Sequence, residues 1–532
     1  MKTAAPKWGI VLASLVALFI AGTLGALFWH SPSLAFEEIW RDAYFRHVTW
    51  FSFYQALLST LISVGLAIPV AHALHRRRFK GRDLLLKLFA MTLVLPVLVG
   101  VFGLLAIYGN SGLLAKLLSQ WQQPLPFSIY GLNGILLAHV FFNLPYASRL
   151  LLQSLEGIPV EQHKLCAHLG MSQWQKFKWV EWPRLRQQLP QVGSLVFMLC
   201  FTSFATVMAL GGGPKSTTIE LAIYQAIKFE FDLATGALLA LWQMVLCALL
   251  YLTMQCFARP LPASQGHMGE LNQWGRETIR SQLWDGFWIG MVLLLVLPPL
   301  LMVIISGLNA QLFTLLGRQE FWSAVMASLQ IASLAGSIAV AVGCVIVLTS
   351  RHWRIRCQPA KANGIELVGA IILVTPGLVI STGLFLLLRQ VMDVFSMAYW
   401  LVVAVNSLMA LPYVIKTLAQ PMLHLEQRYQ FLCASLGIRG WARIRLIEWR
   451  ALQKPFAHAL SISFLLSMGD LSAIALFGSQ QLTTLPLYLY QLLGSYQMPA
   501  AAVVSLALLV LSVGIYYGVE RLFHRHHKGP SC

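Results

Sequence analysis

Charged residues are scarce in this sequence: they make up only 11% of its 532 positions, whereas 58% of the positions are hydrophobic. A soluble protein of this length usually has about a quarter of its residues charged. The mean hydropathy of +0.68 is correspondingly high. We therefore expect an all-α membrane protein whose main partner is lipid, because helices satisfy their own backbone groups inside a bilayer.

Acidic residues are scarcer than basic ones: the sequence has 20 Asp and Glu and 38 Lys and Arg, which gives a net charge of +18. Such a balance could indicate nucleic-acid binding. The basic residues lie in short loops between apolar runs of about 20 residues, however, which is the pattern of cytoplasmic loops in membrane proteins. We therefore expect no nucleic-acid partner.

Cysteines are absent from every loop that we assign to the outer side, and none has the spacing of a metal ligand. This argues against a disulfide framework or a zinc site and favours cysteine as a small buried hydrophobe. Cytoplasmic segments are expected to hold Cys166, Cys357, Cys433 and Cys532, and apolar spans Cys200, Cys247, Cys256 and Cys344.

The sequence also lacks an ATP-binding loop. Its nearest imitation, Gly211–Thr217, has Pro214 where a glycine must precede the lysine, and it is expected on the outer side. A phosphate cradle needs backbone amides that converge at a helix start. The sequence has no cluster of His, Asp and Glu and no nucleophile beside a base, so it gives no sign of a membrane-embedded enzyme. Any ATPase must be another chain, and we expect no catalytic residue and no metal site.

Apolar runs predict twelve transmembrane helices, each long enough for a hydrocarbon core about 30 Å thick. The first, within Met1–His30, is too long for a signal peptide and is read as a retained helix. With the N-terminus inside, inner segments hold 31 of the 38 Lys and Arg. Both termini are therefore expected in the cytoplasm. The other spans are 50–74, 86–108, 131–152, 191–212, 234–256, 284–308, 323–349, 365–388, 396–420, 457–478 and 499–523.

One polar segment occurs twice, as Leu165–Pro183 and, 267 positions later, Leu432–Arg450. Each copy reads Leu-Cys-Ala-x-Leu-Gly and continues with apolar residues three apart, which form one ridge on a helix. The ridge residues are Trp174, Phe177 and Val180 in the first copy and Trp441, Ile444 and Ile447 in the second. The ridge could pack on its own membrane domain or dock on a partner, because an exposed apolar ridge is costly.

Further matches extend this repeat into two parallel six-helix halves, with a substrate path expected between them. Pro96 and Gly103 correspond to Pro376 and Gly383. We divide the chain into a first transmembrane helix and outer loop (1–49), a first core (50–257), a cytoplasmic linker (258–283), a seventh helix and outer loop (284–322), a second core (323–523) and a basic cytoplasmic tail (524–532).

The spacing of Gly170, Val180 and Pro183 resembles the conserved cytoplasmic loop of binding-protein-dependent ABC importer permeases, which runs Glu-Ala-Ala, three residues, Gly, nine residues, Ile, one residue, Leu-Pro. Gly437 and Ile447 match it in the second copy, where Arg450 replaces the final proline. The Glu-Ala-Ala part has drifted in both copies. Glu161 or Glu426 could replace its acid at a different distance.

The wider sequence, including HVFFNLPYASRLLLQ and LGGGPKSTTIELAIYQ, is similar to the fused type I permeases of thiamine and thiamine pyrophosphate ABC importers. The resemblance implies a bacterial inner-membrane protein fed by a periplasmic binding protein and driven by a cytoplasmic ATPase homodimer. ATP and Mg would be used by that partner and no cofactor by this chain. The implied ATPase-coupling residues are Leu165, Gly170, Trp174, Phe177, Val180, Pro183, Leu432, Gly437, Trp441, Ile444 and Ile447.

Three polar residues fall inside expected spans, where such side chains are costly unless paired or wetted. Asp470 could attract a cationic substrate, cap a broken helix or bond to a neighbouring helix. His139 and Asn406 stand 267 positions apart, so we expect each to bond across helices, with a proton relay as the alternative.

Two competing functions remain at this stage. The same architecture serves other imported substrates such as ferric iron. Twelve helices in two parallel halves are also typical of secondary transporters. Such transporters have a basic loop between spans two and three, and Arg76–Arg82 resembles that loop. Secondary carriers usually couple transport through intramembrane acids, however, and Asp470 offers little of that chemistry.

Overall fold

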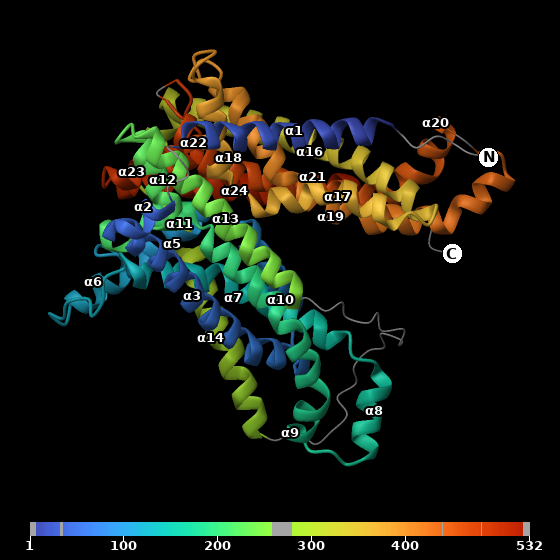
Figure 1. Cartoon of the computed structure of the whole chain (residues 1–532). Helices are drawn as coiled ribbons and strands as arrows, with labels where there is room; N and C mark the ends of the chain where they lie inside the picture. Colours follow the sequence, from blue (N-terminus) through green and yellow to red (C-terminus); the bar gives the residue numbers. More distant parts are fainter. Residues whose placement is uncertain (1–6, 32–35, 258–278, 439, 480, 525–532) are drawn as a thin grey trace. The chain divides into compact units, whose positions relative to one another are not determined.

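A computed structural model describes residues 7–31, 36–257, 279–438, 440–479 and 481–524 (Figure 1). Within these ranges all regular secondary structure is helical. Ten of the described helices are long and apolar enough to cross a membrane, or up to twelve if each of two bent pairs counts as one span. The expected all-α polytopic fold is confirmed, while the number twelve stays a prediction.

The chain forms two compact units, and neither is a continuous stretch of sequence. Unit 1 comprises Met1–Glu38, Ala222–Val245 and Gly307–Cys532, and unit 2 comprises Ile39–Leu221 and Leu246–Ser306. Each unit thus takes a segment from the other half of the sequence. The domain boundaries expected above are linear and do not describe this exchange. Of the expected linker and tail, residues 258–278 and 525–532 lie outside the described residues.

Unit 2 is built around α3 (Ala43–Arg76), which packs against α7 (Leu132–Glu156) and α10 (Trp182–Phe201). The face of α3 that turns inward carries small residues, among them Ser52, Ala56, Ser59, Ser63 and Ala67, and all of these are buried. Small side chains at such spacing let helix backbones approach closely, which favours association where no hydrophobic effect drives it.

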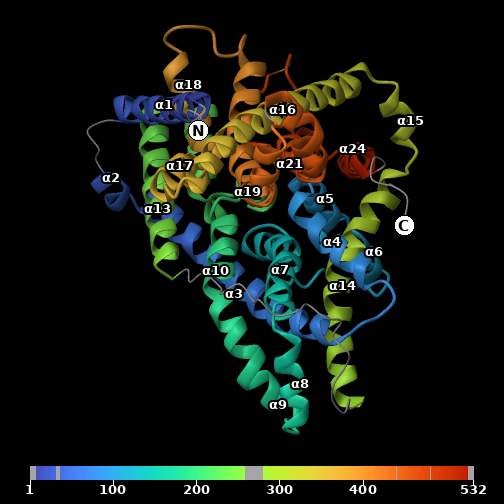
Figure 2. The same cartoon turned by 90° about the vertical axis from the view of Figure 1, so that its right-hand side faces the viewer.

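Unit 1 repeats this arrangement around α16 (Gln319–Ile355), which packs against α19 (Ala398–Ser435) and α21 (Trp449–Gly469). Its buried face again has small residues, Ser328, Ala332, Ala335, Gly336 and Ala339. Figure 2 shows α16, α19 and α21 side by side. The same packing rule therefore operates in both units.

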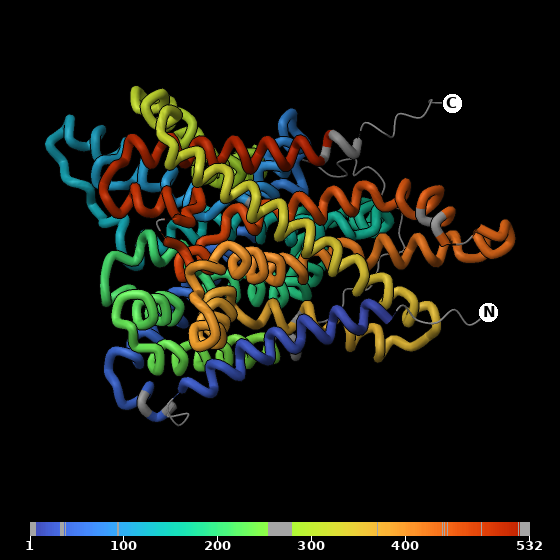
Figure 3. The backbone as a smooth tube through the Cα atoms, turned by 90° about the horizontal axis from the view of Figure 1, so that it is seen from above, coloured from blue at the N-terminus to red at the C-terminus, as the bar shows by residue number. Residues whose placement is uncertain are grey.

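Helix α1 (Lys7–His30) packs on α18 (Gly377–Leu388) and α16, although it comes from the other end of the sequence (Figure 3). Glycines make this contact and its counterpart close. A Cβ added at Gly383 would lie 2.4 Å from the carbonyl oxygen of Thr23, and one at Gly103 would lie 2.5 Å from that of Pro299 in α14 (Ile279–Gly307). Glycine is thus required at these two matching positions by close backbone approach.

Four of the expected spans contain a break in the helix, although 457–478 still lies almost wholly within one membrane-length stretch, Arg445–Phe477. The expected helix 86–108 is divided into α4 (Arg82–Val94) and α5 (Val97–Tyr108), and 365–388 into α17 (Pro359–Val374) and α18. Pro96 and Pro376 lie at these breaks, because proline lacks an amide hydrogen and holds the preceding residue extended. Segment 191–212 bends by 52° between α10 and α11 (Phe204–Leu210), and 457–478 breaks between α21 and α22 (Ser472–Phe477).

The remaining elements are short helices and two membrane-length helices. They are α2 (Phe36–Arg41), α6 (Leu113–Ser119), α8 (Val160–His168), α9 (Gln173–Lys176), η1 (Phe177–Glu181), η2 (Pro214–Ser216), α12 (Ile219–Lys228), α13 (Leu233–Phe257), α15 (Gln311–Leu316), α20 (Gly440–Arg443), η3 (Ile444–Glu448), α23 (Leu485–Gly494) and α24 (Met498–His524).

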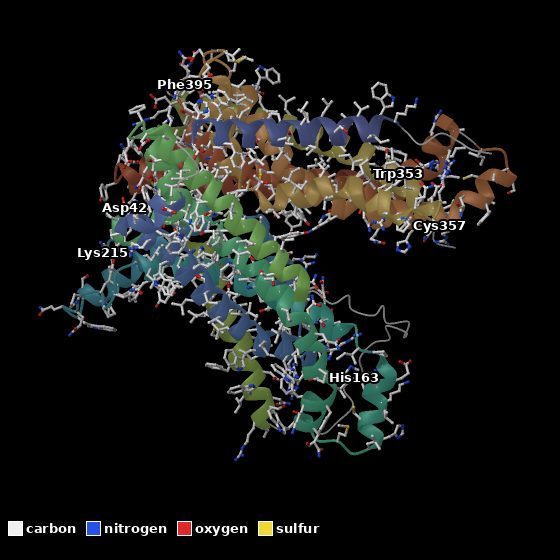
Figure 4. The ribbon with its side chains drawn as sticks, in the orientation of Figure 1. Asp42, His163, Lys215, Trp353, Cys357 and Phe395 are labelled. Atoms are coloured by element: carbon white, nitrogen blue, oxygen red, sulfur yellow. The ribbon has the colours of Figure 1, made fainter. Side chains whose placement is uncertain are left out.

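Each unit has two distinct ends (Figure 4). In unit 2, Asp42 and Lys215 lie at one end and His163 at the other; in unit 1, Phe395 lies at one end and Trp353 and Cys357 at the other. The two copies of the repeated polar segment lie at the His163 end and the Trp353 end, respectively. These ends also hold the basic clusters 76–82 and 351–356.

Candidate functional site

The first copy of the repeated segment folds as a helix, a glycine turn and a second helix. Gly170 ends α8 with a φ of +64°, and the amide of Met171 donates to the carbonyl of Cys166 at 3.0 Å. This is a Schellman end, in which glycine takes the left-handed conformation that other residues avoid. Ser172 and Gln175 then form a capping box that starts α9.

The second copy repeats the turn. Gly437 has a φ of +67°, and the amide of Ile438 donates to the carbonyl of Cys433 at 2.9 Å. A short helix, α20, follows at Gly440. Gly170 and Gly437 therefore both adopt the left-handed conformation, and each turn is followed by a short helix.

The apolar ridge of the first copy is divided between its own unit and solvent. Phe177 is half-buried, with its ring edge-on to His72 of α3 at a centroid distance of 4.9 Å, and Val180 is also half-buried. Trp174 stacks on Phe177 at 5.7 Å yet remains 70% exposed. One large aromatic side chain is therefore left for contact outside the unit.

The other predicted coupling residues are placed as follows. Leu165, Gly170 and Pro183 are exposed in the first copy, as are Leu432 and Gly437 in the second, while Ile447 is half-buried. The side chains of Trp441 and Ile444 lie outside the described part of the chain, although their backbones belong to α20 and η3.

A π-helical turn joins each short helix to the membrane helix that follows. In unit 2 the turn η1 connects α9 to α10, and in unit 1 the turn η3 connects α20 to α21. Each turn ends on a glutamate, Glu181 or Glu448, and both glutamate side chains are buried. Turns of this kind are rare and are frequent at functional sites.

In unit 2 the C-terminal end of α3 holds α9 and η1 through polar contacts. His72 Nε2 lies 2.9 Å from the Glu181 carboxylate, and Lys176 Nζ lies 3.6 Å from it. The Arg76 guanidinium donates to the side-chain oxygen of Gln173, the first residue of α9. His163 of α8 lies nearby, where burial, aided by the positive charge of Lys176, lowers its pKa to about 4. His163 is therefore neutral near pH 7.

In unit 1 both bases that pair with the buried glutamate are arginines, whereas unit 2 has a histidine and a lysine. Arg351 of α16 and Arg443 of α20 each lie 3.2 Å from the Glu448 carboxylate. Glu426 of α19 also binds both arginines, so two acids and two bases form one network. Burial lowers the pKa of Arg443, but its bonds to these acids outweigh that effect and raise it. Glu426 therefore faces its own unit, whereas Glu161 on α8 is exposed.

Sequence reasoning missed Glu181 and Glu448. They stand 267 positions apart, as do Lys176 and Arg443, so the same offset that revealed the ridge also marks the ion pairs. Their partners on α3 and α16 could not be found from the sequence, because they lie about 100 positions away, as His72 and Arg351.

The three polar residues within spans all have partners. His139 Nδ1 lies 2.9 Å from the Ser59 hydroxyl of α3, and Asn406 donates to the Ser467 hydroxyl of α21 at 3.0 Å. The expected bonds across helices are thus present. Asp470 accepts from the hydroxyl of Ser472 at 2.7 Å and from the amide of Ala473 at 3.1 Å, which caps α22 after the break.

A scan against protein-family models gave no match. Curated proteins, however, match nearly the full length. The chain is 47% identical over 529 residues to the thiamine transport system permease protein ThiP of Salmonella typhimurium, covering 98% of each chain. It is 41% identical over 512 residues to the same-named protein of Haemophilus influenzae, covering 96% of this chain and 94% of the relative. The chain belongs to the thiamine transport system permease family.

A more distant member of the ABC permease group matches only half of this chain. The sulfate transport system permease protein CysW of Synechocystis is 25% identical over 249 residues, which are 45% of this chain but 89% of CysW. One half of this thiamine-permease-family chain therefore corresponds in length to a whole CysW. This finding and the apolar helices agree on a multi-pass inner-membrane transport protein.

Proposed function

We propose that this chain is the membrane permease of an ATP-driven importer that carries thiamine and its phosphates across the bacterial inner membrane. The observation that carries the proposal is identity of 40–47% over nearly the whole length with ThiP proteins from several bacteria. Thiamine enters through those relatives' names, and the physical arrangement of the chain supports the transport part independently.

A separate cytoplasmic ATPase homodimer would supply the energy, with ATP and Mg bound by that partner rather than by this chain. Supporting this, each unit presents one short helix after a glycine turn at its basic end. In unit 2 that helix exposes Trp174, a side chain of the type that anchors protein interfaces. We name α9 and α20 the coupling helices and assign one ATPase subunit to each.

The basic ends would face the cytoplasm, and both termini with them. The inner ends of α3 and α16 carry Arg76, Arg77, Arg351 and Arg354, and lysine and arginine concentrate on the cytoplasmic side of membrane proteins. The opposite ends, marked by Lys215 and Phe395, would then face a periplasmic binding protein that delivers the substrate.

Transport would follow from coupled equilibria. ATP would favour one conformation of the ATPase dimer and, through the coupling helices, one conformation of the permease. The loaded binding protein would favour the same state. Each ligand must interact differently with the two states, because only differential affinity shifts such an equilibrium.

The test is reconstitution in liposomes with the purified ATPase and binding protein. Labelled thiamine should enter only when ATP is on the ATPase side and the binding protein is on the other, and an ATPase variant unable to hydrolyse ATP should abolish uptake. A chain with intact ATPase binding that imports ferric iron or sulfate but not thiamine would contradict the substrate. Uptake driven by an ion gradient without ATP would establish a secondary transporter instead.

A further inference from the structure

We infer that Glu181 and Glu448 are positioning residues that lock each coupling helix to one long membrane helix, so that motion of α9 and α20 passes to α3 and α16. The inference rests on the proposed function and extends it, because it names the residues through which a separate ATPase would move the permease. It comes from three features that the two units share: a paired, buried acid at the end of a π-helical turn, a long membrane helix that this acid reaches, and a bond at the far end of that helix.

The first feature is the position of the acids. Each lies at the end of a π-helical turn between a coupling helix and a membrane helix, and Glu181 is only 2% exposed. An ionised carboxylate is costly to bury unless it is paired. In unit 2 it is paired with one base on the coupling helix side, Lys176 at 3.6 Å, and one on α3, His72 at 2.9 Å. The acid therefore bridges two elements.

Unit 1 makes the same bridge with different bases. Glu448 pairs with Arg443 on the coupling helix and with Arg351 on α16, each at 3.2 Å. The coupling-helix bases, Lys176 and Arg443, occupy equivalent positions of the repeat, as do the two acids. The membrane-helix base differs in type, histidine in one unit and arginine in the other. What the repeat retains is thus the bridge itself.

The second feature is that the bridge is the inner end of a long rod. Helix α3 has 34 residues and α16 has 37, which at 1.5 Å per residue correspond to about 50 Å and about 55 Å. Helix α16 has no internal proline, whereas α3 contains Pro69 close to His72 and lacks one backbone hydrogen bond there. Both remain single helices that can pass a displacement from one end to the other. In unit 2 the coupling segment holds this rod at further points, since Phe177 packs on His72 and Gln173 accepts from Arg76.

The third feature is a matching bond at the outer end of each rod. The Ser52 hydroxyl of α3 accepts from the amide of Ile219 at 3.0 Å, and the Ser328 hydroxyl of α16 accepts from the amide of Leu485 at 2.7 Å. Both hydroxyls are buried, and both amides belong to the start of an outer helix, α12 or α23. Each coupling helix is thus connected through one acid and one rod to one outer helix.

The experiment uses Glu181→Gln, Glu448→Gln and the double variant in complex with the ATPase. Glutamine keeps the volume and hydrogen-bonding capacity of glutamate but removes its charge. The matched control is Glu320→Gln, because Glu320 is exposed in the first turn of α16 and lies outside both repeated segments. Three quantities are measured: ATPase retained per permease, stimulation of ATP hydrolysis by the thiamine-loaded binding protein, and amide hydrogen exchange of α12 and α23 with and without ATP.

We expect the double variant to retain as much ATPase as the control, while stimulation falls at least about fivefold, the lower end of typical coupling between sites. The ATP-dependent change in exchange at α12 and α23 should disappear. Each single variant should affect the outer helix bonded to its own rod, α12 for Glu181→Gln and α23 for Glu448→Gln. Unchanged stimulation and unchanged exchange would overturn the inference. A loss of folding or of ATPase binding as large as the loss of uptake would also overturn it, because the acids would then have only a structural role.

The exchange measurement needs no transported substrate. Suppose the wild-type complex does not respond to thiamine but shows an ATP-dependent change in exchange that the double variant lacks. This result would contradict the proposed substrate and support the bridges. A complex that imports thiamine with equal efficiency in wild type and double variant would contradict the bridges and leave the proposed function intact.

Discussion

Replacing Trp174 by alanine should weaken ATPase binding far more than it weakens the permease. Trp174 is 70% exposed, and its only ring contacts in unit 2 among the described residues are with neighbouring Phe177. An aromatic pair of this kind contributes about 0.5–1.5 kcal/mol. The free energy of unfolding of the permease should therefore fall by about 1.5 kcal/mol at most.

The loss at the interface should be larger. A tryptophan buries about 150–250 Å², of which the exposed fraction leaves roughly 140 Å² for a partner. At about 25 cal/mol per Å² this area is worth about 3.5 kcal/mol. Since about 1.4 kcal/mol corresponds to a tenfold change in affinity, Trp174→Ala should weaken the ATPase complex about 300-fold.

The assay is titration of detergent-solubilised permease with the labelled ATPase, with thermal unfolding measured on the same samples. Trp121→Ala is the matched control, because Trp121 is 75% exposed and follows α6 at the other end of unit 2. The control should bind the ATPase as the wild type does. Equal binding by both variants, or equal weakening by both, would refute the assignment of α9 as a coupling helix.

Three further predictions concern the turns, the helix exchange and a buried histidine. Gly170→Asp with Gly437→Asp places side chains at φ values of +64° and +67°, which costs about 1–2 kcal/mol at each position. This double variant should insert into the membrane but no longer co-purify with the ATPase. Unchanged co-purification would count against docking of the ATPase at these turns. Gly383→Ala should lower the melting temperature because its Cβ meets backbone at 2.4 Å, whereas Gly364→Ala, in open space, should not; similar shifts would contradict the close packing of α1. Burial lowers the pKa of His163 to about 4, so between about pH 6.5 and pH 4 the unfolded state binds a proton that the folded state does not. As the pH falls through this window, α8 should therefore lose protection against amide hydrogen exchange. If His163→Gln shows the same loss, another titrating group causes it.

The sequence predicts the membrane class, most spans and the coupling segments because these depend on local signals. Long apolar runs satisfy the length of a bilayer, and a glycine followed by a capping serine indicates a helix end and a helix start, as found at Gly170 and Ser172. An internal repeat strengthens each of these signals, since a feature that occurs at Gly437 as well is supported twice.

The breaks and the helix exchange were missed because they depend on contacts distant in sequence. Pro96 and Pro376 were noticed as matching residues, but hydropathy across them is uninterrupted, so the spans were predicted as continuous. The packing of α1 on α18 and α16 joins segments at opposite ends of the sequence, such as Thr23 and Gly383, and no local signal predicts it. Likewise, the partners of Glu181 and Glu448 became known only once α3 and α16 were in place.

The most direct test of the central claim is oxidative footprinting of tryptophan in the assembled complex. The rate of oxidation of Trp174 is compared with and without the ATPase, with Trp121 as the internal reference, since the two side chains are similarly exposed in the free permease. If α9 is a coupling helix, the ATPase should slow oxidation of Trp174 strongly and leave Trp121 unchanged. Unchanged oxidation of Trp174 in a complex that hydrolyses ATP and transports substrate would contradict the account.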